Sequence, residues 1–312
     1  MKRLFLKAAG AAAAGALLKA CGGGGGGDAG NSCQLPSGND SLLQRLQQDG
    51  RFSTLLQAVN KAGLAGTLDD RGASLTLFAP DNTAFDRLGQ RIGFVNGNGV
   101  VAALSSTQWT DILNFALLQQ RSSLCDLTPS SGDLRPQTRF TQPNGEVAKL
   151  IFVRERSSDP LTIWDGIGRF LITFQQSDLG AVNGVMHVPN DVLLPRYVLT
   201  LSQMLRASID SFSDFATSIT ADVPELNGAG SFTVFAPFNG TFTPPLTRNQ
   251  RRHHVVSGTT LRSNDFANNP RLTPLFGAAL TLTSSTVNTK NITDVDFFGS
   301  NGAIHDVAGI VP

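Results

Sequence analysis

The chain has 312 residues, of which 16% are charged, and its formal net charge is +1. This length accommodates about two domains of ~100–200 residues each. Nucleic acid is excluded as an expected partner, because binding its phosphates requires a clustered basic face, and apart from the run Arg-Asn-Gln-Arg-Arg at 248–252 the sequence has no basic patch. The low charge, with 32 glycines and 15 prolines, favours an exported, β-rich binding protein over a charged cytosolic enzyme.

Residues 1–20 are predicted to be a signal peptide. Three basic residues precede a short apolar run at 8–18. That run is too short to cross a membrane, since a spanning helix needs ~20 residues. The segment Lys-Arg-Leu-Phe-Leu-Lys at 2–7 resembles a twin-arginine signal with lysine in place of the first arginine. The twin-arginine route and the general secretory route both stay open.

Residues 21–39 are predicted to hold a lipid-anchor cysteine and a Gly-rich tether. The sequence Leu-Lys-Ala-Cys that ends at Cys21 resembles a bacterial lipobox, and six glycines follow at 22–27. Gly-rich segments behave as flexible coils. We therefore expect a protein of the cell envelope, held by Cys21 to the outer membrane on its periplasmic or surface face. The alternative is an ordinary cleaved signal and a soluble secreted protein.

The chain contains three cysteines, Cys21, Cys33 and Cys125. If Cys21 carries lipid, Cys33 and Cys125 remain, and an exported protein can join them in a disulfide. Two unpaired thiols are the alternative.

Helices and strands are expected to alternate through residues 41–194. Apolar residues at helical spacing indicate helices, and alternating β-branched and aromatic residues indicate strands. Pro80 should end the first strand, after which Asp81 or Asn82 can cap a short helix. Asn183-Gly184 is a turn signal between two strands. The predicted helices are 41–64 with a break at Gly50, 83–88 and 102–118, and the predicted strands are 74–79, 149–154, 161–164, 170–174 and 185–194.

The rest of the chain is expected to repeat this order. A helical region at 199–220 precedes predicted strands at 231–236, 280–284 and 292–298. Residues 251–257 are predicted to continue from a short helix into a strand, and Asn301-Gly302 supplies the second turn signal. Clustered helices together with antiparallel strands indicate the α+β class.

Two sequence patterns occur twice and in the same order. Leu-Thr-Leu-Phe-Ala-Pro-Asp-Asn-Thr-Ala-Phe at 75–85 is echoed at 232–242, and Asn-Gly-Val-Met-His-Val at 183–188 is echoed at 301–306. Two ordered landmarks indicate a duplicated domain. The first landmarks lie 157 residues apart and the second 118, so the first domain is 39 residues longer between them. Insertions of this size usually lie in surface loops.

Both patterns resemble those of the fasciclin family, which typically carries T-x-F-A-P-x-x-x-A-F near the start of a domain and N-G-x-I-H near its end. The resemblance implies two tandem fasciclin-like domains at 40–195 and 196–312, the second shorter and more divergent. Each would be a β-sheet wedge flanked by helices. The family-motif residues are expected to be mainly structural: Phe78, Ala79, Pro80, Phe85, Asn183, Gly184, His187, Phe235, Ala236, Pro237, His254, Asn301, Gly302 and His305.

The histidines are the residues that could carry chemistry. His187 and His305 occupy equivalent positions and could be ligands or bases, but the resemblance places there a histidine whose ring satisfies buried backbone groups. His253 and His254 are adjacent on a predicted strand and would point to opposite faces, so they are poor joint metal ligands. No hydrolase, zinc-protease or phosphate-loop motif is present. We predict no catalytic residue, no metal and no cofactor.

The predicted function is that of a non-catalytic adhesion or binding lipoprotein. Its expected partners are the membrane, through the lipid anchor, and an unknown protein or polysaccharide ligand. Tandem domains would add avidity by raising the effective concentration of the second site. Two alternatives stay open: an enzyme that modifies envelope polysaccharides, and a structural envelope protein that binds another protein.

Overall fold

The computed structural model describes residues 33–154, 156, 158–169 and 172–312. The predicted signal peptide, Cys21 and the six-glycine run lie outside these residues. Within them, no helix is both long enough and apolar enough to cross a membrane.

Helices dominate the start of the first domain. Ser41 caps α1 through a capping box with Gln44, and Asp81 caps α4 by accepting from the backbone N–H of Ala84. Most of the apolar side chains of these helices are buried in one core cluster, whereas Phe115 at the end of α6 belongs to a second cluster. The helical segments are α1 (Leu42–Gln48), η1 (Gly50–Phe52), α2 (Ser53–Ala62), α3 (Ala65–Asp69), α4 (Asn82–Ile92), α5 (Gly97–Ala103) and α6 (Ser106–Phe115).

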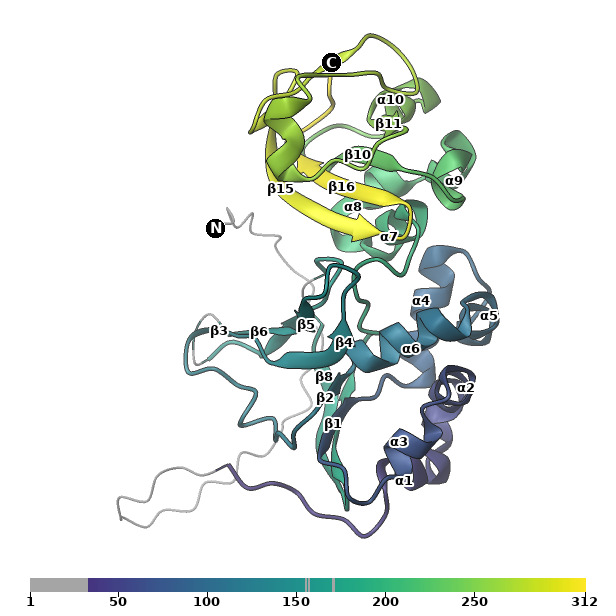
Figure 1. Cartoon of the computed structure of the whole chain (residues 1–312), viewed down its shortest axis with the longest axis vertical. Coiled ribbons are helices and arrows are strands. Elements are labelled where there is room, and N and C mark those ends of the chain that lie inside the picture. Colours follow the sequence, from purple (N-terminus) through teal and green to yellow (C-terminus); the bar gives the residue numbers. More distant parts are fainter. Residues whose placement is uncertain (1–32, 155, 157, 170–171) are drawn as a thin grey trace. The chain divides into compact units, whose positions relative to one another are not determined.

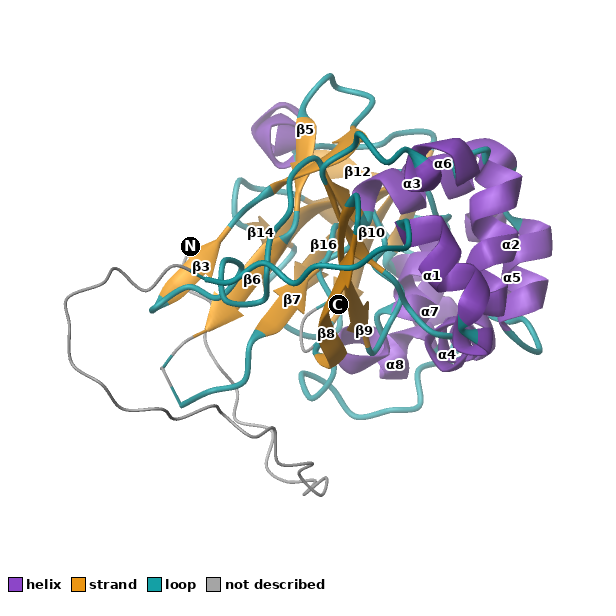
Figure 2. Cartoon of the chain, turned by 90° about the horizontal axis from the view of Figure 1, so that it is seen from below, coloured by secondary structure: helices purple, strands orange, loops and turns teal. Residues whose placement is uncertain are grey.

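The main sheet of the first domain joins the two sequence landmarks. Its strand order is β2-β1-β9-β8, and β1 runs parallel to β9 with Thr76 opposite Val185. Figures 1 and 2 show α1–α6 together on one side of this sheet. The strands are β1 (Leu75–Phe78), β2 (Leu117–Leu118), β8 (Phe174–Ala181) and β9 (Gly184–Pro189).

The residues between β2 and β8 of the first domain form two small sheets. One has the strand order β3-β6-β7 and the other pairs β4 with β5. Both contribute to an apolar cluster that includes Phe140, Phe152 and Ile163. The strands are β3 (Gly132–Leu134), β4 (Gln137–Thr141), β5 (Val147–Lys149), β6 (Ile151–Arg154) and β7 (Thr162–Trp164).

The second domain repeats the main sheet in the order β11-β10-β16-β15-β14. Here β10 runs parallel to β16, with Thr233 opposite Ala303. The elements are α7 (Leu201–Ala207), α8 (Ile209–Ala216), α9 (Ile219–Asp222), η2 (Pro224–Asn227), β10 (Phe232–Pro237), α10 (Arg248–His253), β11 (Val255–Ser257), η3 (Ser263–Asn268), β12 (Arg271–Leu272), β13 (Leu280–Thr281), β14 (Thr286–Val287), β15 (Lys290–Gly299) and β16 (Gly302–Val307). The predicted α+β class is confirmed, and the limits at 40–195 and 196–312 stay a prediction.

Several expected elements differ from the structure. The strand expected at 170–174 is β8, which begins only at Phe174, and the helical region expected at 199–220 is divided into α7, α8 and α9. The predicted helix at 102–118 is divided, because Leu104 is extended and Ser105 begins α6 with its own capping box. The predicted placement of His253 and His254 on a strand is wrong. His253 is the last residue of α10 and His254 is its C-cap, so β11 begins only at Val255.

The segment that leads into the first domain is fixed to it. Cys33 and Cys125 form a disulfide across 92 residues of sequence, with their Cα atoms 5.7 Å apart. Arg121 donates a hydrogen bond to the carbonyl of Pro36, and a Cβ on Gly38 would overlap the backbone of Gly180. Residues 33–38 therefore lie against the first domain rather than hanging free.

Reducing this disulfide is expected to lower the free energy of unfolding by roughly 4 kcal/mol, because the bond closes a long loop in the unfolded chain. The measurement is a denaturant titration with and without reductant. The double variant Cys33→Ser with Cys125→Ser should have the denaturation midpoint of the reduced wild-type protein, and adding reductant should not change that midpoint. An equal midpoint for the oxidised and reduced wild-type proteins would contradict the expectation.

Candidate functional site

The two landmark asparagines connect three parts of each domain. The side-chain oxygen of Asn183 accepts the backbone N–H of Leu42 at 2.9 Å, and its amide donates to the carbonyls of Leu68 and Asp70 at 3.0 and 2.9 Å. Asn183 is fully buried. It therefore ties the start of α1 and the end of α3 to the turn between β8 and β9.

Asn301 makes the same three bonds in the second domain. Its oxygen accepts the N–H of Leu201 at 2.8 Å, and its amide donates to the carbonyls of Leu226 and Gly228 at 3.0 and 2.7 Å. The following glycine is required by close packing in both domains. A Cβ at Gly184 would come within 2.5 Å of the carbonyl oxygen of Leu75, and one at Gly302 would overlap the carbonyl of Phe232.

His187 and His305 satisfy buried backbone groups on both sides of the ring. The Nδ1 atom of His187 accepts the N–H of Asp178 at 3.2 Å, so Nε2 carries the proton and donates to the carbonyl of Ser122 at 3.0 Å. His305 accepts from Asp296 at 3.2 Å and donates to the carbonyl of Leu261 at 3.1 Å. Neither ring is exposed to solvent.

The aspartates opposite these histidines were not found from the sequence. Asp178 and Asp296 have positive φ angles of 59° and 67°, and each lies where the β8–β9 or β15–β16 register shifts. Asp178 also accepts the backbone N–H of Leu124 at 2.8 Å. The available signal was spacing, since each aspartate precedes its landmark asparagine by five residues.

His254 has a different set of partners. Its Nδ1 donates to the carbonyl of Phe235 at 2.6 Å, and its Nε2 accepts the N–H of Val311 at 3.2 Å. Ala116 occupies the equivalent position in the first domain. The carbonyl of Ala116 accepts the N–H of Phe78, just as the carbonyl of His254 accepts the N–H of Phe235. His254 therefore joins the C-terminal residues to the sheet in the second domain only.

Burial keeps all three rings neutral near pH 7. It lowers the pKa of both His254 and His305 to about 4, although a backbone carbonyl and, for His305, the charge of Asp296 act in the opposite direction. The pKa of His187 is also lowered, again mainly by burial. A histidine without solvent access, already bonded at both nitrogens, has no free atom with which to bind a ligand or move a proton.

The remaining family-motif residues form the core around these histidines. The ring of Phe78 stacks on His187 with centroids 5.7 Å apart, and Phe235 lies 5.8 Å from His305. Phe85 packs on Trp109 at 5.8 Å. Ala79, Pro80, Ala236 and Pro237 are buried at the ends of β1 and β10. All fourteen motif residues named from the sequence are buried, so ligand binding must involve other residues.

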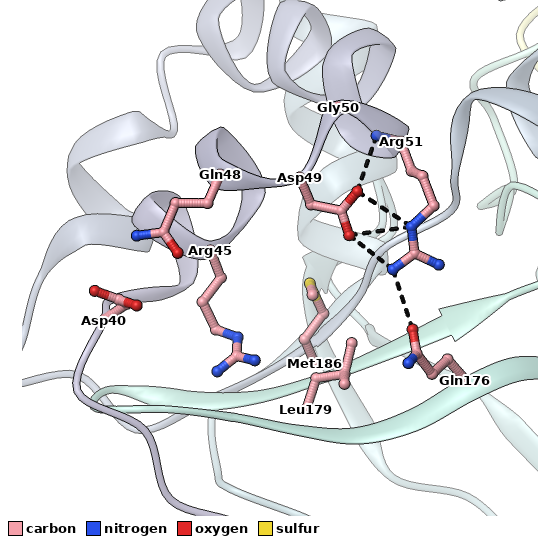
Figure 3. Close-up of a pocket in the computed structure, with 9 residues that line it drawn as sticks. All are labelled: Asp40, Arg45, Gln48, Asp49, Gly50, Arg51, Gln176, Leu179 and Met186. Carbon is pink, nitrogen blue, oxygen red and sulfur yellow. Dashed lines mark hydrogen bonds and ion pairs between the residues drawn. The ribbon is translucent and has the colours of Figure 1, made fainter.

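A pocket of about 450 Å³ opens at the surface of the first domain. It lies between α1, η1 and the hairpin of β8 and β9 (Figure 3). Two apolar side chains, Leu179 and Met186, face each other across that hairpin and form the floor. The lining residues are Asp40, Arg45, Gln48, Asp49, Gly50, Arg51, Gln176, Leu179 and Met186.

The two arginines of this pocket differ in their electrostatic state. Arg51 forms an ion pair with Asp49 at 2.7 Å and also donates to the side chain of Gln176 at 3.2 Å. This pairing lowers the pKa of Asp49 and raises that of Arg51. Arg45 donates through Nη1 to the carbonyl of Gly180, and no carboxylate among the described residues lies within ion-pair distance of it. Arg45 is thus a cation of the pocket that has no direct ion-pair partner among the described residues.

The second domain does not repeat this pocket chemistry. Ser41 and Thr200 cap equivalent helices, and the carbonyls of Asp40 and Leu199 accept equivalent N–H groups from Val182 and Ser300. When the two domains are aligned on these equivalent contacts, Met204, which is 1% exposed, lies at the position of Arg45. The fold therefore accommodates an apolar residue where the first domain has its unpaired arginine.

Within the described residues no group of histidine, cysteine, aspartate or glutamate side chains could hold a metal ion.

The duplicated sheet and its histidine and asparagine contacts define a tandem α+β protein whose paired motifs are structural. The fasciclin domain model matches residues 50–195 and 210–311, and the chain belongs to this family. The expected resemblance is thereby confirmed.

Two known proteins are similar to this chain. The chain is 28% identical over 228 residues to transforming growth factor-beta-induced protein ig-h3 of Oryctolagus cuniculus, a match that covers 70% of this chain and 29% of that protein. It is also similar to the solved structure of a FAS1 domain pair from the insect cell adhesion molecule fasciclin I. That match has 16% identity and a TM-score of 0.38, and covers 86% of this chain and 95% of the other.

Proposed function

We propose that this protein is a non-catalytic adhesion or binding lipoprotein of the bacterial cell envelope. The observation that carries the proposal is the match of both halves to the fasciclin family, one of whose solved members is described as a cell adhesion molecule. The burial of every motif histidine supports a binding role over a catalytic one, since these rings cannot reach a substrate. The ligand would be a protein or polysaccharide outside the cell.

The location rests on the N-terminal sequence. The predicted signal at 1–20, the lipobox-like segment that ends at Cys21 and the glycines at 22–27 support export and a lipid anchor on a flexible tether. Such a tether would hold two folded domains away from the outer membrane. The disulfide between Cys33 and Cys125 is compatible with an oxidising compartment.

The anchor is tested by fractionation and intact-mass measurement of the chain expressed in a bacterium. We expect a chain that begins at Cys21 and carries an acyl mass in the membrane fraction, and Cys21→Ala should move it to the soluble fraction. The double variant Cys33→Ala with Cys125→Ala serves as the control and should stay in the membrane. An unlipidated wild-type chain in the soluble fraction would disprove the anchor.

Adhesion is tested separately with intact cells. Cells that express the full chain should adhere to a polysaccharide-coated or matrix-coated surface more strongly than cells without it. The soluble purified chain, added in excess, should compete with this adherence because it occupies the same ligand. Equal adherence of both cell types on every surface would remove the support for an adhesive role.

A further inference from the structure

The pocket at α1 and the β8–β9 hairpin has the chemistry of an acidic-sugar site. We propose that Arg45 binds the carboxylate of a hexuronate residue in an acidic polysaccharide, with the sugar ring on the floor of the pocket. This inference rests on the proposed binding function and identifies the ligand class of the first domain.

The first step is the charge of Arg45. A guanidinium carries five N–H donors, and within the described ranges Arg45 donates only through Nη1, to the carbonyl of Gly180. Its Nε and Nη2 atoms form the side-on fork that fits a carboxylate through two parallel hydrogen bonds. Figure 3 shows this guanidinium above the hairpin, between Asp40 and Met186. The fork is therefore available to an incoming anion.

The second step is the rest of the lining, which suits hydroxyl groups. Asp40 has no ion pair or side-chain hydrogen bond within the described part of the chain, and an ionised carboxylate only accepts hydrogen bonds. The exposed amides of Gln48 and Gln176 can both donate and accept. A sugar acid presents one carboxylate and several hydroxyls. The carboxylate fits the guanidinium of Arg45, and the hydroxyls fit the carboxylate of Asp40 and the two glutamine amides.

The same lining disfavours other anions. A phosphate would bring about two negative charges near Asp40 and Asp49. An acidic peptide side chain would offer Arg45 its carboxylate but has no hydroxyl for Asp40. The half-buried side chain of Leu179, which packs beside buried Met186, instead provides an apolar surface for the C–H face of a pyranose ring. The volume of about 450 Å³ lies in the usual range for small-ligand pockets.

The third step is the comparison between the duplicated domains. The helix that carries Arg45 has Met204 at the equivalent position, with the same N-cap contacts and the same strand contact before it. An arginine is thus not needed to build this part of the fold. Its half-buried, unpaired charge in the first domain is explained by a ligand.

The test measures binding of a galacturonate trisaccharide to the full chain by calorimetry, with a galactose trisaccharide as the uncharged probe. The wild type should bind galacturonate and bind galactose weakly or not at all. Arg45→Met, which installs the residue that the second domain uses, should weaken galacturonate binding roughly tenfold or more. Arg45→Lys should give an intermediate loss because it keeps the charge without the fork. Arg248→Met, an exposed arginine outside the pocket, should leave the affinity unchanged.

Several results would overturn the proposal. These are equal binding of the two trisaccharides, unchanged affinity in Arg45→Met with its thermal melt intact, and displacement of galacturonate by inorganic phosphate at similar concentration. Arg45-dependent binding of polyglutamate as tight as that of galacturonate would assign the pocket to acidic peptides instead. If cells adhere but the purified chain does not bind galacturonate, the ligand assignment is rejected and the adhesive function is kept. If the cells do not adhere and the chain does not bind galacturonate, both proposals are rejected.

Discussion

Lowering the pH from 7 to 4 is expected to reduce the free energy of unfolding of the second domain by roughly 6 kcal/mol through His254 and His305. Burial lowers the folded-state pKa of each ring to about 4, from an ordinary value of 6.5. Between these values the unfolded chain takes up a proton at each histidine that the folded chain does not. Stability is therefore full above about pH 6.5 and falls until the pH passes the folded pKa.

Denaturant titrations at several pH values, followed with a probe in the second domain, measure this slope. The signals of the four imidazoles in the NMR spectrum give their pKa values directly. Titration of His254 and His305 near pH 6.5, or a stability that is flat from pH 7 to pH 4.5, would contradict the expectation.

Asn183→Ala is expected to destabilise the first domain by about 5 kcal/mol. The substitution strands the N–H of Leu42 and two carbonyls, those of Leu68 and Asp70, in a buried site. Each stranded buried group costs about 1–3 kcal/mol. Asn301→Ala should have an equivalent effect in the second domain, because its three bonds are the same.

The matched control is Asn144→Ala in the same domain. Asn144 is exposed, and in the part of the chain that the structure describes its side chain bonds only to Glu146. This variant should change the free energy of unfolding by less than about 1 kcal/mol, as is usual for surface substitutions. Similar denaturation midpoints for Asn183→Ala and Asn144→Ala would show that Asn183 does not hold α1 and α3 to the turn.

The duplicated domain could be predicted from the sequence because its determinants are local and repeated. A strand ended by Pro80 or Pro237 and a turn at Asn183-Gly184 or Asn301-Gly302 recur in order. The structure pairs these segments in parallel in both domains. The family follows from the same residues, since their spacing is a property of the chain alone.

Contacts between distant residues required the tertiary structure. Hydrophobic periodicity could not predict the hydrogen bond from the backbone N–H of Asp178 to His187, because this bond depends on a register shift between two strands. The predicted strand position of His254 was wrong, since α10, which Thr247 caps at its start, continues to His253 and leaves His254 as its C-cap.

The pocket depends on the tertiary structure for the same reason. Asp40 and Arg45 come from the start of the domain and Gln176 and Met186 from its end. Backbone and side-chain bonds between the start of α1 and the β8–β9 turn bring them together. The sequence by itself determined the repeated framework, because local patterns specify caps, turns and strands. The tertiary structure decided which charges stay unpaired, because pairing depends on distances between residues far apart in the chain.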